Sequence, residues 1–114
     1  MSDAINPGHY RSHPSGIECI DFTRRMSFNR GNALKYIWRA GLKGDRQQDI
    51  DKAKWYLRDE CFYQLPAVYD ESTRESLIAL LRVLAVCESN ERMVIINRII
   101  FGEWMTLENL AESL

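Results

Sequence analysis

Cysteine and proline are scarce in this chain: its 114 residues include three of each. The cysteines, Cys19, Cys61 and Cys87, stand far apart in the sequence, and no C-x-x-C pair occurs. Neither a disulfide framework nor a zinc site is therefore indicated. Each cysteine has apolar neighbours, so we expect three buried thiols that behave as small hydrophobic residues.

Long apolar runs are absent as well. No run approaches the roughly eighteen residues that a membrane-spanning helix needs. The first four residues also lack the basic and then apolar stretches of a signal peptide. We therefore expect a single domain over residues 1–114 that contacts no membrane and stays in the cytoplasm.

Several motifs that identify enzyme families are missing. The chain contains no G-x-x-x-x-G-K-[ST], no G-x-G-x-x-G and no G-x-S-x-G. A P-loop nucleotide site is excluded, and a dinucleotide site or a hydrolase nucleophile elbow is not indicated. No serine or cysteine has an obvious base nearby in sequence, so nucleophilic catalysis is not supported.

Charge is nearly balanced over the chain, with a net charge of −1, but it is unevenly distributed. Residues 1–60 hold 11 Lys and Arg against 8 Asp and Glu, whereas residues 61–114 hold 4 against 8. The two halves therefore carry +3 and −4. Seven basic residues between 24 and 46 face a single acid, Asp45. The seven are Arg24, Arg25, Arg30, Lys35, Arg39, Lys43 and Arg46. A short basic segment in a near-neutral protein predicts a local anion site, and binding to nucleic acid is not expected.

Apolar spacing predicts an all-α fold: a compact helical domain of about five to six helices with an extended N-terminal arm. The arm covers 1–16, because residues 5–16 contain two prolines and two glycines. Helices are expected at about 17–26, 31–40 and 46–63, which form a ligand-binding segment over 17–63. Further helices at 71–88, 91–102 and 106–114 form a C-terminal core and self-association segment over 70–114. The β-branched stretch 91–102 could also be a strand, although its apolar spacing favours a helix.

One face of the predicted helix at 31–40 carries Asn32, Lys35, Tyr36 and Arg39 and no acid. An amide, a phenol and two cations suit the recognition of a phosphate and a base. Lys43, in the turn that follows, would extend this face. The alternative is that Lys35 and Arg39 form ion pairs with acids of neighbouring helices, for which Glu18, Asp21 and Asp49 are available.

Two further groups are candidates for the same site. Glu18 and Asp21 stand one helical turn apart and could hold Mg²⁺ for a nucleotide, or could simply be acids favoured at a helix N-terminus. His9 and His13 are four residues apart in a proline-interrupted arm, so a helical metal pair is excluded. His9 and Tyr10 could close over a bound phosphate and base, or belong to an ordinary packed arm.

The chain resembles a family of small bacteriophage proteins commonly labelled phage nucleotide kinase, or T7 early nucleotide kinase-like. The resemblance covers about residues 6–60 and rests on four segments. These are Asn6-Pro7-Gly8-His9-Tyr10, residues 16–21, residues 32–44 and residues 49–57. It implies a phage protein that acts in the host cytoplasm as a homo-oligomer and handles nucleotides without a Walker motif. The motif positions that it transfers are His9, Tyr10, Glu18, Asn32, Lys35, Tyr36, Arg39 and Lys43.

Three functions follow as hypotheses. The first is a module that captures a nucleotide or a nucleotide-derived signalling molecule unchanged, for example to counter a host defence. The second is a nucleoside monophosphate kinase with Mg²⁺ near Glu18 or Asp21, in which cations stabilise the transferred charge. The third is an oligomeric protein-interaction module built on 71–88 and 91–102.

Overall fold

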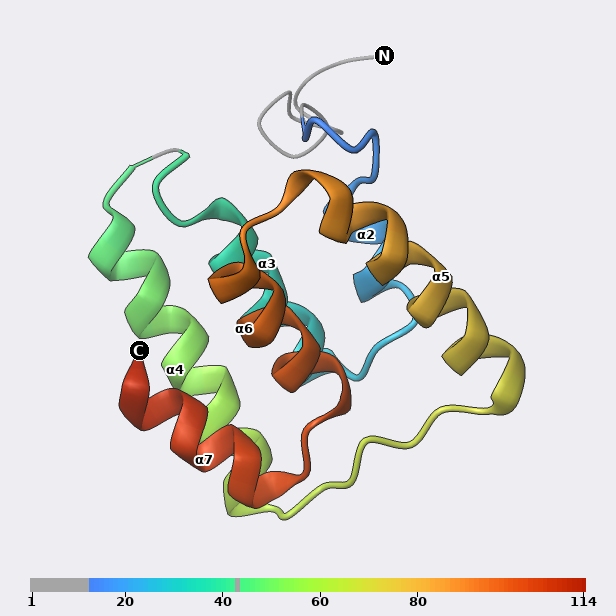
Figure 1. Ribbon diagram of the computed structural model, residues 1–114. Coiled ribbons are helices and arrows are strands. Elements are labelled where there is room, and N and C mark those ends of the chain that lie inside the picture. Colours follow the sequence, from blue (N-terminus) through green and yellow to red (C-terminus); the bar gives the residue numbers. More distant parts are fainter. Residues whose placement is uncertain (1–12, 43) are drawn as a thin grey trace.

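The computed structural model describes residues 13–42 and 44–114, and within these residues it contains helices and no strand. The all-α prediction is confirmed, whereas most of the predicted arm lies outside the described residues. The helices, labelled as in Figure 1, are α2 (Cys19–Thr23), α3 (Phe28–Arg39), α4 (Arg46–Phe62), α5 (Glu71–Cys87), α6 (Asn90–Phe101) and α7 (Trp104–Ser113).

Side-chain caps set the start of the longer helices. Asp45 accepts hydrogen bonds from the backbone N–H groups of Gln47 and Gln48, and Asp70 accepts one from the N–H of Thr73. Each carboxylate satisfies N–H groups that a helix leaves free in its first turn. The last helix begins earlier than the predicted residue 106, since α7 starts at Trp104.

The first predicted helix is shorter than expected. α2 ends at Thr23, and the backbone then closes tight turns in which Arg25 N donates to Phe22 O and Met26 N to Thr23 O. Ser27 takes an extended conformation and α3 begins at Phe28, earlier than predicted. The basic pair at 24 and 25 therefore lies in this turn and not on a long helix.

The β-branched stretch forms helix α6, as its spacing predicted. Ile96, Ile99 and Ile100 are fully buried, and their separation of three and four residues places them on one face of a helix. Burial of this face against α3 and α7 outweighs the intrinsic β preference of isoleucine.

α3 and α4 pack along each other, and the C-terminal helices complete their core. α7 packs on α4 and α6 packs on α3, while α2 contacts α3 and α5 (Figure 1). The hydrophobic core therefore draws on both halves of the chain. Its largest fully buried apolar side chains are Phe22, Leu34, Trp38, Leu57, Leu77, Leu84, Ile96, Ile99, Ile100, Leu107 and Leu110.

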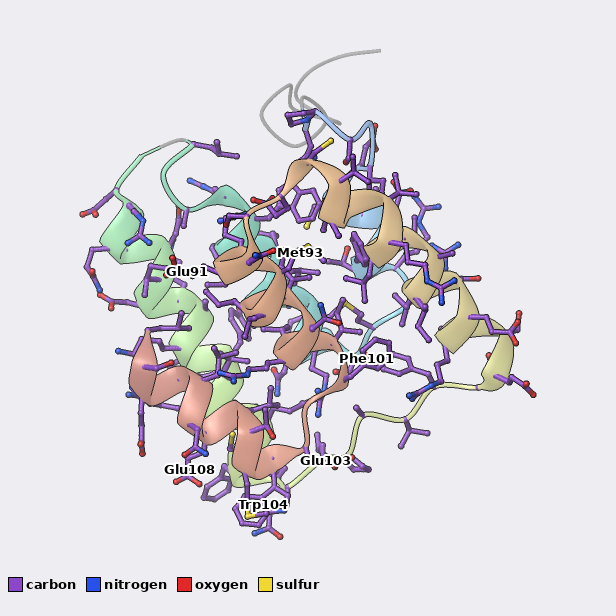
Figure 2. All side chains as sticks on the ribbon, in the orientation of Figure 1. Glu91, Met93, Phe101, Glu103, Trp104 and Glu108 are labelled. Carbon is purple, nitrogen blue, oxygen red and sulfur yellow. The ribbon has the colours of Figure 1, made fainter. Side chains whose placement is uncertain are left out.

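α5 stands at one side of the molecule and is joined to α4 by a long loop (Figure 1). Leu77, Leu81 and Leu84 are buried, but Val86 is 84% exposed, so only one side of this apolar helix enters the core. The ring of Tyr69 in the loop meets the ring of Phe101 edge-on, with centroids 5.7 Å apart. Phe101 is the last residue of α6 (Figure 2). Self-association through residues 70–114 would require contacts between copies of the chain. It therefore stays a prediction.

A buried ion pair ties three helices together. Arg30 Nε donates to Glu60 Oε2 at 2.8 Å, and both side chains are almost completely buried. The same guanidinium donates to the carbonyl oxygens of Ile99 and Leu65, and Ser27 Oγ donates to Glu60. Arg30 is thus a structural residue, although in the sequence it belongs to the basic segment that predicted an anion site.

The cysteines differ in their surroundings, which corrects the expectation of three buried thiols. Cys19 is buried, and this burial raises the pKa of its thiol to about 12. Cys61 is partly buried, whereas Cys87 is exposed at the end of α5. None of the helices in 13–42 and 44–114 combines the length and the apolar character that crossing a bilayer requires.

Candidate functional site

Helix α3 separates the predicted ligand face from the core. Ala33, Leu34, Ile37 and Trp38 are buried, while Asn32, Lys35, Tyr36 and Arg39 are partly exposed. His9, Tyr10 and Lys43, the other predicted ligand-binding residues, lie outside the described residues.

Asn32 and Lys35 border a hollow of about 330 Å³ beside the turn between α2 and α3. The rest of the lining comes from Thr23, Met26, Ser27, Phe28 and Gly31. Asn32 is held along the helix, because its side-chain amide donates to Phe28 O at 2.9 Å. This leaves the acceptor oxygen of the amide, and the Lys35 ammonium, as polar groups at the rim of the hollow.

Next to this hollow lies an aromatic cluster of Phe28, Tyr36, Trp55 and Tyr56. The ring of Tyr56 lies nearly parallel to that of Tyr36, with centroids 6.0 Å apart, and meets Phe28 and Trp55 edge-on. Phe28 is 76% exposed and Trp55 is 61% exposed. Exposed aromatic side chains gathered in this way offer a surface on which a planar base can stack.

Two ammonium groups lie over the ring of Tyr36 in this cluster. Lys35 Nζ is 4.9 Å and Lys52 Nζ is 5.3 Å from the ring centroid, so the two nitrogens are at most 4.9 + 5.3 = 10.2 Å apart. Within 13–42 and 44–114 neither lysine forms an ion pair. Like charges repel, and a ring face compensates for only part of that repulsion, so this pair of cations favours an anion between or beside them.

Arg39 has a different environment from Lys35. Its Nε lies 3.5 Å from Oδ2 of Asp49, a carboxylate that is almost completely buried in the first turn of α4. This is the pairing that the alternative interpretation expected for Arg39, and it reduces the charge that this cation can offer to a ligand. Lys35, by contrast, does not form such an ion pair with an acid among the described residues.

Glu18 and Asp21 act together at the start of α2. The backbone N–H of Glu18 donates to Asp21 Oδ2 at 2.8 Å, which is the reciprocal arrangement of a capping box. Arg24 Nη2 lies 3.9 Å from the other oxygen of Asp21. In the described part of the chain, no three His, Cys, Asp or Glu side chains are grouped as a metal site would require. The capping box gives Asp21 a structural role, and Mg²⁺ binding by Glu18 and Asp21 stays a prediction.

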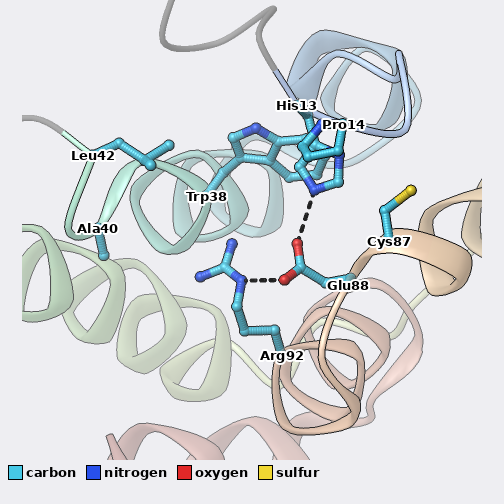
Figure 3. Close-up of a pocket in the computed structure, with 8 residues that line it drawn as sticks. All are labelled: His13, Pro14, Trp38, Ala40, Leu42, Cys87, Glu88 and Arg92. Atoms are coloured by element: carbon cyan, nitrogen blue, oxygen red, sulfur yellow. Dashed lines mark hydrogen bonds and ion pairs between the residues drawn. The ribbon is translucent and has the colours of Figure 1, made fainter.

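Sequence reasoning missed a polar cluster that joins the start of the described chain to the junction of α5 and α6. His13 Nε2 donates to Glu88 Oε2 at 2.9 Å, and Arg92 Nε donates to Glu88 Oε1 at 2.9 Å (Figure 3). Ser15 Oγ lies 2.7 Å from His13 Nδ1, so a serine does have a base beside it.

The Ser15 hydroxyl in this cluster is already engaged. Its oxygen accepts a hydrogen bond from Ile17 N–H at 3.1 Å, and Ser15 N–H donates to His13 Nδ1 at 3.1 Å. Such local bonds are the usual way in which serine fixes a turn. The spacing of His13 and Ser15 was visible in the sequence, but the partnership with Glu88 depends on the fold.

Comparison with known proteins places this surface in a family context. Residues 5–58 match the model of a family described as a protein of unknown function, DUF3310. No curated protein and no solved structure matched the chain. The matched segment contains α2, α3 and most of α4, and with them Asn32, Lys35, Tyr36 and Lys52. The part of the chain that carries the candidate surface is therefore the part that is similar to this uncharacterised family.

Proposed function

We propose that this protein captures a nucleotide, or a signalling molecule derived from one, on the surface shared by α3 and α4. The observation that carries the proposal is the pair of ammonium groups, Lys35 and Lys52, over the ring of Tyr36 without an acid partner among the described residues. The phosphate would lie against the two ammonium groups, which act as point charges. The base would stack on the exposed rings of the aromatic cluster.

The hollow beside Asn32 supports the same proposal. A volume of about 330 Å³ lies in the range of small-molecule sites, and its rim carries an amide oxygen and a cation. Binding of an intact ligand requires only these groups, because it needs neither a general base nor a leaving group. The resemblance to phage proteins suggests a role for such capture, namely to lower the concentration of a host signal during infection.

The resemblance also implies a second candidate, a nucleoside monophosphate kinase. Transfer of a phosphoryl group depends on positioning and on cations that stabilise charge, and Lys35 and Lys52 would serve that purpose. The metal ion would need carboxylates, and Asp21 already accepts the Glu18 N–H. Capture is therefore the function that the geometry supports better.

One experiment separates the two candidates. The purified protein is incubated with a labelled nucleoside monophosphate, ATP and Mg²⁺, then denatured, and the released nucleotides are separated by chromatography. Capture predicts that the label co-purifies with the folded protein and returns unchanged, and a label that returns as the diphosphate would establish the kinase instead. Mass spectrometry of small molecules released from freshly purified protein identifies the ligand. Protein that neither retains a nucleotide nor converts the label to the diphosphate would contradict both candidates.

A further inference from the structure

A second hollow, whose lining includes no residue of the aromatic cluster, lies where the two halves of the chain meet (Figure 3). It measures about 370 Å³ and is bordered by three separate segments: the residues before α2, the end of α3, and the junction of α5 and α6. This volume is sufficient for a small organic molecule. The hollow therefore exists only when the two halves pack together.

Apolar groups and rings form most of its wall. Pro14, Trp38 and Leu42 border the hollow, and the imidazole of His13 lies 5.2 Å from the Trp38 ring, measured between centroids. Trp38 is nearly completely buried, so its position is fixed by the core behind it. A rigid wall of this kind favours a flat apolar body over a flexible polar one.

The polar atoms of His13 and Glu88 are already engaged with each other and with their neighbours. His13 Nδ1 accepts from Ser15 N–H, and its Nε2 is the donor to the Glu88 carboxylate. Glu88 accepts from His13 through one oxygen and from Arg92 through the other. These two residues consequently have little left to offer a ligand.

Arg92 is the exception. Its Nε donates to Glu88 and its Nη1 donates to Ile37 O at 3.3 Å, and these two bonds fix the plane of the guanidinium. A guanidinium has five N–H groups, so three remain without an acceptor among the described residues. Arg92 also borders the hollow, so it presents a preorganised set of donors beside an apolar wall.

We propose that this hollow is a binding site for a small, flat monocarboxylic acid whose carboxylate is held by Arg92 and whose apolar body lies against Trp38, Pro14 and Leu42. A carboxylate matches the forked donors of a guanidinium. One negative charge suits the site better than the two of a phosphate monoester, because the carboxylate of Glu88 already lies 2.9 Å from Arg92 Nε. The site is separate from the nucleotide surface and does not depend on it.

The three tryptophans allow a direct test by NMR in the intact protein. The indole N–H signals of Trp38, Trp55 and Trp104 are assigned from single Trp→Phe variants, and 1-naphthoate is titrated into ¹⁵N-labelled protein. The expected result is a saturable shift of the Trp38 signal, while Trp104 does not move. The neutral analogue 1-naphthalenemethanol should bind about tenfold more weakly or worse, because it lacks the charge-assisted bond to Arg92.

Substitutions in the hollow test whether Arg92 and the apolar wall are the groups that bind 1-naphthoate. Arg92→Lys keeps the positive charge but loses the forked N–H donors of the guanidinium, so the affinity for 1-naphthoate should fall about tenfold. Arg98→Lys, on the same helix, is the control and should leave this affinity unchanged. Leu42→Trp narrows the hollow from its exposed rim without touching Arg92, and it should also weaken binding. An unmoved Trp38 signal, equal affinity for the acid and the alcohol, or a shift of Trp55 alone would each overturn the proposal.

Cys87 supplies a second readout at the same site. It borders the hollow and is exposed, so iodoacetamide should reach it readily. Saturating 1-naphthoate should slow its alkylation several-fold, and this protection should disappear in Arg92→Lys. Alkylation at the same rate with and without the probe would show that the hollow stays unoccupied, and the proposal would then fail.

Discussion

His13 and Glu88 are 75 residues apart in the chain, yet their side chains form a hydrogen bond of 2.9 Å in which Nε2 donates to Oε2. Both side chains are 12% exposed. The bond fastens the residues before α2 to the end of α5, and Arg92 extends it to the end of α3 through Ile37 O. The N-terminal half of the chain, which contains the segment similar to the family, and the C-terminal half are thus joined by polar contacts as well as by the core.

Stability should depend on pH through this carboxylate. Burial tends to raise the pKa of Glu88, but the hydrogen bond from His13, the charge of Arg92 and the bond from Ser89 N–H outweigh it, so the pKa is lowered from its usual 4.5. A lowered pKa in the folded state means that the stabilisation is complete above pH 4.5 and is lost as the pH falls through the folded-state pKa. Urea unfolding at pH 7 and at several values below 4.5 measures this loss.

Glu88→Gln is the matched variant for that measurement. It should cost about 1–3 kcal/mol at pH 7, because the amide carries no charge and offers one acceptor oxygen to the two donors, His13 Nε2 and Arg92 Nε, that the carboxylate accepts from. Its stability should also change less between pH 7 and pH 3 than that of the unmodified protein. If the two proteins lost the same free energy of unfolding over this range, the assigned role of Glu88 would be wrong.

The buried pair of Arg30 and Glu60 should be costly to break on one side only. Arg30→Met leaves the Glu60 carboxylate buried without its cation and should lower the free energy of unfolding by about 3–5 kcal/mol. The double variant Arg30→Met, Glu60→Leu removes both charges and should recover much of that loss. Urea denaturation of the single and double variants tests this, and a cost below about 1 kcal/mol for Arg30→Met would contradict it.

The three thiols should react in a fixed order. Cys87 is exposed and should be alkylated first, Cys61 should follow slowly, and Cys19 should react only on unfolding. Burial gives Cys19 a pKa of about 12, so its reactive thiolate is scarce at neutral pH, and burial also raises the pKa of Cys61. Peptide mass spectrometry after timed alkylation reads the order, and early modification of Cys19 in native protein would disagree with the packing described.

A side chain at Gly102, between α6 and α7, should destabilise the fold. A Cβ added there would lie 2.5 Å from the carbonyl oxygen of Arg98 and 2.9 Å from a methyl group of Thr106. Gly102→Ala should therefore cost about 1–3 kcal/mol, as other forced contacts in packed regions do. Gly31→Ala is the control, since its Cβ would meet Thr23 at an ordinary 3.5 Å, and thermal unfolding should separate the two variants clearly. Equal melting temperatures would contradict the geometry at Gly102.

Local signals in the sequence predicted the helices well where a cap marks the start, as Asp45 and Asp70 do. They failed at α2, because the tight turns after Thr23 are stabilised by local bonds that apolar spacing does not reveal. They also placed Arg30 in a basic surface, since nothing in the sequence distinguishes an exposed arginine from one buried beside Glu60.

The candidate site was predictable only in part. Helical spacing alone groups Asn32, Lys35 and Tyr36 on α3. The contribution of α4 depends on how the two helices cross, which brings Lys52 and Tyr56 to the ring of Tyr36. The same crossing brings Asp49 to Arg39 and so weakens one predicted contact.

If a nucleotide binds the α3–α4 surface through Lys35 and Lys52, the loss of either ammonium group should weaken its equilibrium binding. The nucleotide identified by mass spectrometry is titrated into the unmodified protein and into the variants Lys35→Met and Lys52→Met. Lys54→Met is the control, because Lys54 is a lysine on the same helix as Lys52, α4, but away from the Tyr36 ring. Each of the first two substitutions should weaken binding about five- to thirtyfold, as the loss of a charge-assisted contact of roughly 1–2 kcal/mol implies, and Lys54→Met should leave it unchanged. Equal affinities for all four proteins would show that neither Lys35 nor Lys52 contacts the nucleotide.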